Sequence, residues 1–96
     1  MLTIRRTDAF QRWLDGLRDV RALARIAMRL DRLALGNPGD VRAVGEGVRE
    51  MRIDDGPGYR VYFVQRGSEV IVLLCGGDKS SRERDIAQAK DLAREV

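Results

Sequence analysis

The amino-acid sequence predicts a small α+β domain in which a strand and two helices precede three antiparallel strands and a final helix. Three observations support this order. Apolar residues recur with helical spacing between residues 7 and 35, they alternate between residues 48 and 65, and a capping pattern stands at residues 80–83. The 96 residues suffice for one hydrophobic core, so we expect a single domain over residues 1–96 with the order β-α-α-β-β-β-α.

The N-terminal third is expected to form a short strand and a helical hairpin. Residues 2–5 are the candidate strand, Thr7 is the predicted N-cap of the first helix, and a break near Asp19 leads into the second. The two apolar stripes consist of Phe10, Trp13, Leu14 and Leu17, and of Leu23, Ile26, Leu30 and Leu33. Residues 36–39, Gly-Asn-Pro-Gly, end the second helix. Both stripes need a partner surface, so the hairpin should pack on a sheet, with its aromatic residues in the core.

The remaining elements are expected to form an antiparallel meander and one helix. Residues 40–47 are polar and rich in glycine, which predicts a connection without a strand. Strands are predicted at residues 48–53, 59–65 and 69–75, with turns at residues 54–58 and 66–68. The last strand is apolar on both faces, as expected for a central strand. Ser80 and Glu83 form a candidate capping box for the final helix, whose apolar stripe is thin and should dock weakly.

Charged side chains of the first predicted hairpin fall on one face, which we expect to be exposed. Because side chains alternate along a strand, Glu50 and Arg52 share a face. The register set by the turn places Arg52 opposite Arg60 and Glu50 opposite Tyr62. Like charges that face each other destabilise a sheet, so stability alone does not explain two opposed arginines. An anion bound between them would explain the pair.

Composition argues against several classes of protein. No apolar run approaches the roughly 18 residues that span a bilayer, and no signal-peptide core follows Met1, so we expect a cytoplasmic protein without membrane contact. The single cysteine, Cys75, cannot form an internal disulfide. The chain has no histidine and no residues with metal-ligand spacing, so neither a metal nor a cofactor is expected. A net charge of +3 supports nucleic-acid binding only weakly.

Six segments, taken together, resemble a known family. They are residues 10–17, 25–30, 36–40, 44–53, 56–63 and 73–80, and they cover nearly the whole chain in the right order. The sequence resembles the RelE/ParE superfamily of toxins from bacterial type II toxin–antitoxin systems, in particular the HigB-like branch of addiction-module killer proteins. The resemblance implies a compact toxin fold, arrest of growth, and a cognate antitoxin, for which a helix-turn-helix DNA-binding protein is one candidate.

The resemblance leaves the activity open between two classes. In the RelE and HigB branches the toxin cleaves mRNA, usually on the ribosome, and in the ParE branch it inhibits DNA gyrase. The absence of histidine, and of any tyrosine after Tyr62, departs from the well-studied ribonucleases and favours gyrase inhibition. Glu50 and the facing arginines favour an mRNA endoribonuclease, which we expect. A degenerate toxin that only binds its antitoxin is a third possibility.

The sequence offers four candidate catalytic residues for metal-independent RNA cleavage. This reaction needs a base for the 2′-hydroxyl proton, cations for the phosphorane and an acid for the leaving oxygen. Glu50 is the candidate base, with a salt bridge to Arg52 or Arg60 as its alternative role. Arg52 and Arg60 are the candidate phosphate ligands. Lys79, just before a helix N-terminus, is a candidate phosphate ligand or acid, or an ordinary loop lysine.

Four further residues are candidates for RNA binding. Tyr59 and Tyr62 could stack on splayed bases, although tyrosines of a sheet are more often half-buried. Asp78 could orient the lysine that follows it or cap the loop. Arg82, in the first turn of the final helix, could contact a phosphate.

Overall fold

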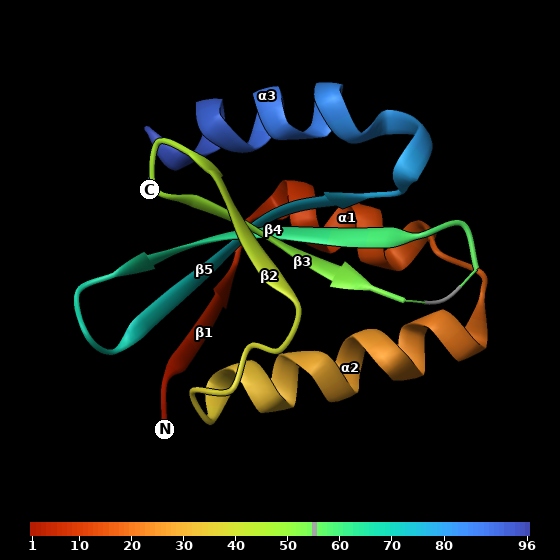
Figure 1. Ribbon diagram of the computed structural model, residues 1–96, viewed down its shortest axis with the longest axis horizontal. Coiled ribbons are helices and arrows are strands. Elements are labelled where there is room, and N and C mark those ends of the chain that lie inside the picture. The colour runs from red at the N-terminus through yellow and green to blue at the C-terminus, as the bar shows by residue number, and fades with distance from the viewer. Residues whose placement is uncertain (55) are drawn as a thin grey trace.

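The computed structural model describes residues 1–54 and 56–96, over which the chain forms a five-stranded sheet with helices on both faces (Figure 1). The sheet has the order β1-β5-β4-β3-β2, and its strands are β1 (Thr3–Arg6), β2 (Val41–Gly45), β3 (Val48–Ile53), β4 (Tyr59–Arg66) and β5 (Val70–Gly77). Only β1 and β5 pair in parallel, and the other described neighbours are antiparallel. The predicted α+β class and the meander are therefore confirmed. Asp55, part of the predicted turn at residues 54–58, lies outside the described residues.

Helices α1 (Asp8–Gly16) and α2 (Val20–Ala34) begin where the sequence predicts. The Thr7 hydroxyl accepts a hydrogen bond from the Phe10 amide at 3.0 Å, and the Asp19 carboxylate accepts one from the Ala22 amide at 3.0 Å. Both helices pack on one face of the sheet. Their shared core consists of Phe10, Ile26, Leu30, Leu33, Met51, Ile53, Val61, Phe63, Ile71 and Leu73. Trp13 packs against this core, so the predicted aromatic stripe is structural.

Strand β2 corrects the prediction that residues 40–47 are a connection. β2 pairs antiparallel with β3 at the edge of the sheet. Half-buried Val41 and Val44, which are three residues apart, pack in different cores on opposite faces of the sheet. A register shift between Ala43 and Gly45 interrupts the pairing. A bulge of this kind breaks the two-residue alternation that identifies a strand in a sequence.

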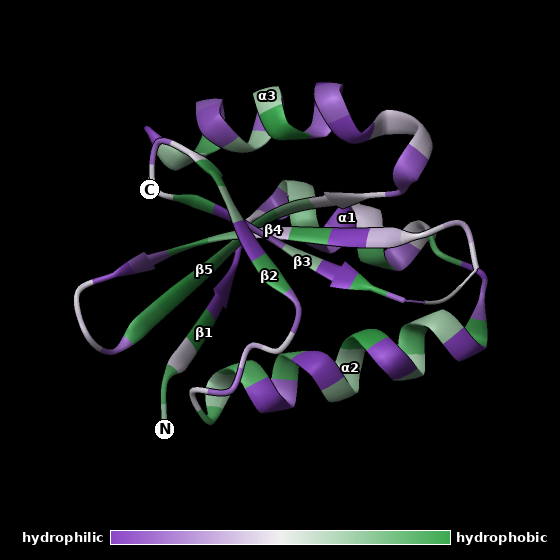
Figure 2. Ribbon diagram, viewed as in Figure 1, coloured by the Kyte–Doolittle hydropathy of each residue, from purple (hydrophilic) through white to green (hydrophobic). Residues whose placement is uncertain are grey.

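The second face of the sheet, expected to be exposed, is covered by helix α3 (Arg82–Ala93). The core on this side consists of Val48, Tyr62, Val64, Val72, Leu74, Cys75, Ala89 and Ala93. Figure 2 shows that α3 is more hydrophilic than α2, which alternates between apolar and hydrophilic residues. The alanines let α3 approach the sheet closely although its apolar stripe is thin. Within the described residues, no helix has the length and apolarity to cross a membrane.

The entry into α3 also differs from the prediction. A short 3-10 helix, η1 (Lys79–Ser81), precedes it, and Asp78 rather than Ser80 is the cap, with Ser81 completing the capping box. The Asp78 carboxylate accepts hydrogen bonds from the Ser80 amide at 2.8 Å and from the Ser80 hydroxyl at 2.5 Å. These bonds lower the pKa of Asp78. The predicted box of Ser80 with Glu83 is therefore wrong, because the upstream carboxylate already binds Ser80.

Candidate functional site

The β3–β4 hairpin has the predicted register. Arg52 is paired with Arg60, and Glu50 is paired with Tyr62. The turn that joins the strands contains Gly56 at φ 55° and Gly58 at φ 74°, in the left-handed region that glycine tolerates best. The two arginines are thereby placed together at the turn end of the hairpin.

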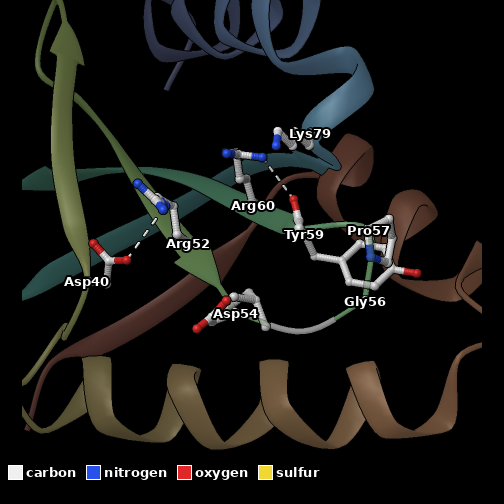
Figure 3. A pocket seen from close by; sticks show the side chains of 10 residues that line it. Asp40, Arg52, Asp54, Gly56, Pro57, Tyr59, Arg60 and Lys79 are labelled. Carbon is white, nitrogen blue, oxygen red and sulfur yellow. Dashed lines mark hydrogen bonds and ion pairs between the residues drawn. The ribbon is translucent and has the colours of Figure 1, made fainter.

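A hollow of about 470 Å³ opens at this end of the sheet (Figure 3). It is lined by Asp40, Arg52, Ile53, Asp54, Gly56, Pro57, Gly58, Tyr59, Arg60 and Lys79. The Lys79 amide donates a hydrogen bond to the Pro57 carbonyl at 3.3 Å, which holds η1 against the hairpin turn. The fold thus brings together four of the predicted site residues from three elements.

A second hollow of about 490 Å³ adjoins the first and shares Arg60 and Lys79 with it. Its other lining residues are Ser80, Ser81, Arg82, Glu83 and Arg84. The lining of the second hollow thus contains four cationic side chains and one carboxylate, that of Glu83. We call the pair Arg60 and Lys79 the cationic ridge, because it separates the two hollows. The second hollow is lined mainly by positive charge, and a concave surface of one charge sign concentrates ions of the other sign, so the ridge suits an anion.

Glu50 lies behind the ridge, fully buried, and both of its carboxylate oxygens are bound. Arg82 donates to them through Nε at 2.9 Å and Nη2 at 3.3 Å, and the Tyr62 hydroxyl donates at 2.9 Å. The Arg60 Nε lies 3.6 Å from the same carboxylate. A buried charge persists only when it is paired and hydrogen-bonded. Glu50 is therefore the buried anchor of two arginines and one tyrosine, which favours its alternative role as a salt-bridge partner.

Arg60 is held in place from two sides. Its Nη1 donates to the Gly58 carbonyl at 2.9 Å, and its Nε faces Glu50 without a hydrogen bond to any described residue. The side chain is 11% exposed and lines both hollows. Guanidinium has five N–H donors, so these contacts leave donors for a ligand.

Arg52 lies at the rim, and its position depends on a residue that the sequence did not single out. Its side chain is 44% exposed and lies 3.6 Å from the carboxylate of Asp40. Arg29, on α2, donates through Nη1 to the Arg52 carbonyl at 2.6 Å and through Nη2 to the Pro38 carbonyl at 3.1 Å. Burial lowers the pKa of Arg29. No local pattern marks Arg29, because its partners lie on other elements.

The other predicted RNA-binding residues divide into two groups. Tyr59 is half-buried at the first hollow, with its ring edge-on to Trp13 at 6.3 Å between centroids, and Arg82 lines the second hollow. Tyr62 is fully buried, so a stacking role for its ring is wrong, and Asp78 caps η1. Among the described residues, no cluster of histidine, cysteine or carboxylate side chains could hold a metal ion.

Burial of Tyr62 and Cys75 predicts that the fold loses stability at alkaline pH. Burial raises the pKa of the Cys75 thiol to about 12, and burial with the Glu50 hydrogen bond raises the pKa of the Tyr62 hydroxyl well above its usual 10. The unfolded chain therefore releases these protons first, and the free energy of unfolding falls as pH rises above about 9. Urea midpoints measured between about pH 8 and pH 11 test this, and Cys75→Ala should flatten the first part of the fall. Midpoints that stay constant over this range would contradict it.

Comparison with known proteins identifies related sequences. The family model described as "Phage derived protein Gp49-like (DUF891)" matches residues 12–95. An uncharacterized protein from Haemophilus influenzae is 47% identical over 95 residues, which are 99% of this chain and 96% of that protein. The likeness therefore extends over nearly the full length of both chains.

Two solved structures have a similar fold. A copper-bound mutant toxin from Helicobacter pylori has a TM-score of 0.64 at 20% identity, covering 84% of this chain and 98% of that chain. The solution structure of a conserved hypothetical protein from Helicobacter pylori has a TM-score of 0.51 at 23% identity, covering 83% of this chain and 97% of that one. At these identities the likeness shows a shared fold.

Proposed function

The chain belongs to the family of phage-derived Gp49-like proteins, and from this premise we propose that it is the toxin of a bacterial toxin–antitoxin module and acts as an mRNA endoribonuclease. The fold, shared with a toxin from Helicobacter pylori, supports the first part. The sequence resemblance favours the HigB-like branch of the RelE/ParE superfamily. The cationic ridge between two hollows supports the second part, because it fits a phosphate with a nucleotide on either side.

The observation that carries the proposal is the setting of Arg60. A guanidinium that is 11% exposed, fixed by Gly58 and Glu50 and open to both hollows is oriented before any ligand arrives. Donors fixed in advance stabilise developing charge more effectively than mobile surface arginines, because they need not reorganise during the reaction. An arginine with only a structural role would not need to line the hollows.

In the proposed reaction, the 2′-hydroxyl attacks the adjacent phosphorus and the bond to the 5′ oxygen breaks, which leaves a 2′,3′-cyclic phosphate and a 5′-hydroxyl. Arg60 and Arg52 stabilise the charge on the phosphorane, and Lys79 donates a proton to the leaving oxygen. The proton of the 2′-hydroxyl passes to water in the open hollow, since Glu50 is buried and bound. A site without a strong base depends on substrate positioning, which fits cleavage of mRNA that the ribosome holds in place.

The proposed partner is an antitoxin that covers the ridge and keeps RNA away from it. Arg60, Lys79, Arg82 and Arg84 present positive charge there, so a segment bearing carboxylates would complement this surface. A helix-turn-helix DNA-binding protein remains the candidate antitoxin from the resemblance.

Mapping of RNA 5′ ends shortly after induction of the protein without an antitoxin tests the proposed function. We expect many new ends inside translated messages, in register with the reading frame, and carrying a 5′-hydroxyl. A parallel culture treated with a translation inhibitor should lose these ends if the ribosome positions the substrate. Growth arrest with an unchanged RNA profile would exclude the nuclease.

A gyrase inhibitor of the ParE type is the second candidate. The observation that favours it is the lack of histidine in the sequence, together with the burial of Tyr62, which leaves few groups for proton transfer. Breaks in chromosomal DNA that depend on gyrase, in cells with intact mRNA, would select this function.

A further inference from the structure

The first hollow has two sides of opposite charge. Arg52, Arg60 and Lys79 lie along one side, and the carboxylates of Asp40 and Asp54 lie on the side nearer α2 (Figure 3). A surface for phosphate alone would not need carboxylates. A nucleotide matches such a surface, because it combines an anionic phosphate with an uncharged base that carries N–H groups.

The two carboxylates are not equivalent. Asp40 forms an ion pair with Arg52 at 3.6 Å. Asp54 is exposed and lines the hollow, and among the described residues no side chain or backbone group pairs with its carboxylate. An unpaired carboxylate repels phosphate but accepts hydrogen bonds. The Asp54 side of the hollow therefore favours the base of a bound nucleotide.

The chemistry of a carboxylate distinguishes among the four RNA bases. An ionised carboxylate can only accept hydrogen bonds, and it accepts two parallel N–H groups best. Guanine alone presents two neighbouring donors, N1–H and N2–H, on its Watson–Crick edge. Adenine, cytosine and uracil each place an acceptor beside their donor, and an acceptor facing a carboxylate leaves both unsatisfied.

Tyr59 lines the first hollow and provides an aromatic ring on which such a base could stack. Its half-buried ring is packed edge-on against Trp13 and lines the same hollow. Unpaired RNA bases are commonly held by stacking on aromatic rings and by hydrogen bonds to their Watson–Crick edges. The volume of about 470 Å³ falls within the usual range for small-molecule sites.

We propose that the first hollow is a guanine-selective nucleotide subsite, in which Asp54 accepts the N1–H and N2–H groups and the cationic ridge holds the phosphate. The inference rests on the proposed function, because it names the base that the RNA-cleaving site prefers. It assigns a role to Asp54, which lies beside the turn and not among the residues that bind phosphate.

Binding of the four nucleoside 5′-monophosphates to the purified protein tests the subsite without any cleavage. Changes in the amide NMR shifts of the residues that line the hollow report binding directly. The fluorescence of Trp13, the only tryptophan, reports binding next to Tyr59, because the two rings are in contact. We expect guanosine monophosphate to bind at least about fivefold more tightly than the other three, as one bidentate base contact allows. Asp54→Asn, which replaces an acceptor by a donor at constant shape, should remove the preference and retain phosphate binding. Asp31→Asn, at an exposed position on α2, is the matched control and should change nothing.

Equal binding of all four nucleotides, no binding at all, or a guanine preference that survives in Asp54→Asn would overturn the inference. Base frequencies at the RNA ends mapped in cells separate this failure from failure of the proposed function. RNA cleavage without guanine at a fixed position relative to the cut would support the nuclease activity and overturn the guanine subsite. Guanine-selective binding in a protein that cuts no RNA would support the subsite and overturn the nuclease.

Discussion

Replacing Arg60 with alanine is expected to lower RNA cleavage and toxicity at least about a hundredfold, the usual cost of removing one preorganised donor to a developing negative charge. The substitution removes the guanidinium that lines both hollows. Glu50 retains its hydrogen bonds from Arg82 and Tyr62, so the buried carboxylate stays paired and the fold should survive. Counts of surviving cells and RNA-end maps, both at matched protein levels, measure the effect.

Two further variants separate the chemistry of Arg60 from its charge and from general effects of losing an arginine. Arg60→Lys keeps the charge but lacks the planar fork of donors, so it should recover only part of the activity. Arg49→Ala removes an exposed arginine from the neighbouring strand, on the opposite face of the sheet, and should retain full activity. Wild-type cleavage by a folded Arg60→Ala protein would show that the ridge is not the site.

The two paired strands of the β3–β4 hairpin could be predicted from the sequence, down to their register. Alternating residues and a glycine-rich turn are local signals, and a slip of one residue would have moved Met51 and Ile53 out of the core. Local signals also located the starts of α1 and α2, where Thr7 and Asp19 satisfy helix amides within their own segments. Such elements are predictable because the interactions that define them lie close together in the sequence.

Strand β2 could not be predicted in the same way, because its evidence is tertiary. It has one neighbour, β3, and its pairing shifts before Gly45. An edge strand with a bulge presents few apolar side chains, and glycine and charged residues are as typical of loops as of such edges. Only the finished sheet shows that Val41 and Val44 are half-buried.

The sequence predicted the positively charged residues of the candidate site, but it did not predict which of the site residues are buried. Alternation correctly placed Glu50, Arg52, Arg60 and Tyr62 on one face, and the loop after β5 brought Lys79 beside them. Alternation cannot say what covers a face, so the burial of Glu50 and Tyr62 beneath α3 was missed. Because Glu50 is buried, it acts as an anchor for its neighbours, whereas the sequence suggested an exposed general base.

Gly77→Ala is expected to lower the free energy of unfolding by about 2–5 kcal/mol, through overpacking and the loss of a partly buried hydrogen bond. A Cβ on Gly77 would lie 1.7 Å from the Asp85 Oδ2 and 2.9 Å from the Ser81 Oγ. Asp85 is 6% exposed and accepts a hydrogen bond from Ser81 at 2.5 Å, so its carboxylate cannot simply swing into water. The first turn of α3 would have to move away from β5.

Urea unfolding of matched variants distinguishes this steric effect from a general cost of losing glycine. Gly16→Ala, at the end of α1 with no atom within 4 Å of the new Cβ, should be neutral or slightly stabilising. Asp85→Ala removes the atom that the Gly77 methyl group would meet, so the double variant should lose less stability than the two single losses added together. Additive losses would show that the contact with Asp85 is not the cause.

The same variant links the stability of α3 to the candidate site. Gly77 pairs with Arg60 across the sheet, and the turn it supports carries Arg82, which binds Glu50. Displacing this turn should therefore withdraw one of the two arginines that neutralise the buried carboxylate. Folded Gly77→Ala protein, isolated at low temperature, should cleave RNA less well than wild type even after correction for the unfolded fraction. Full activity per folded molecule would mean that Arg60 and Tyr62 hold Glu50 well enough without Arg82, and that the glycine serves only the packing of α3.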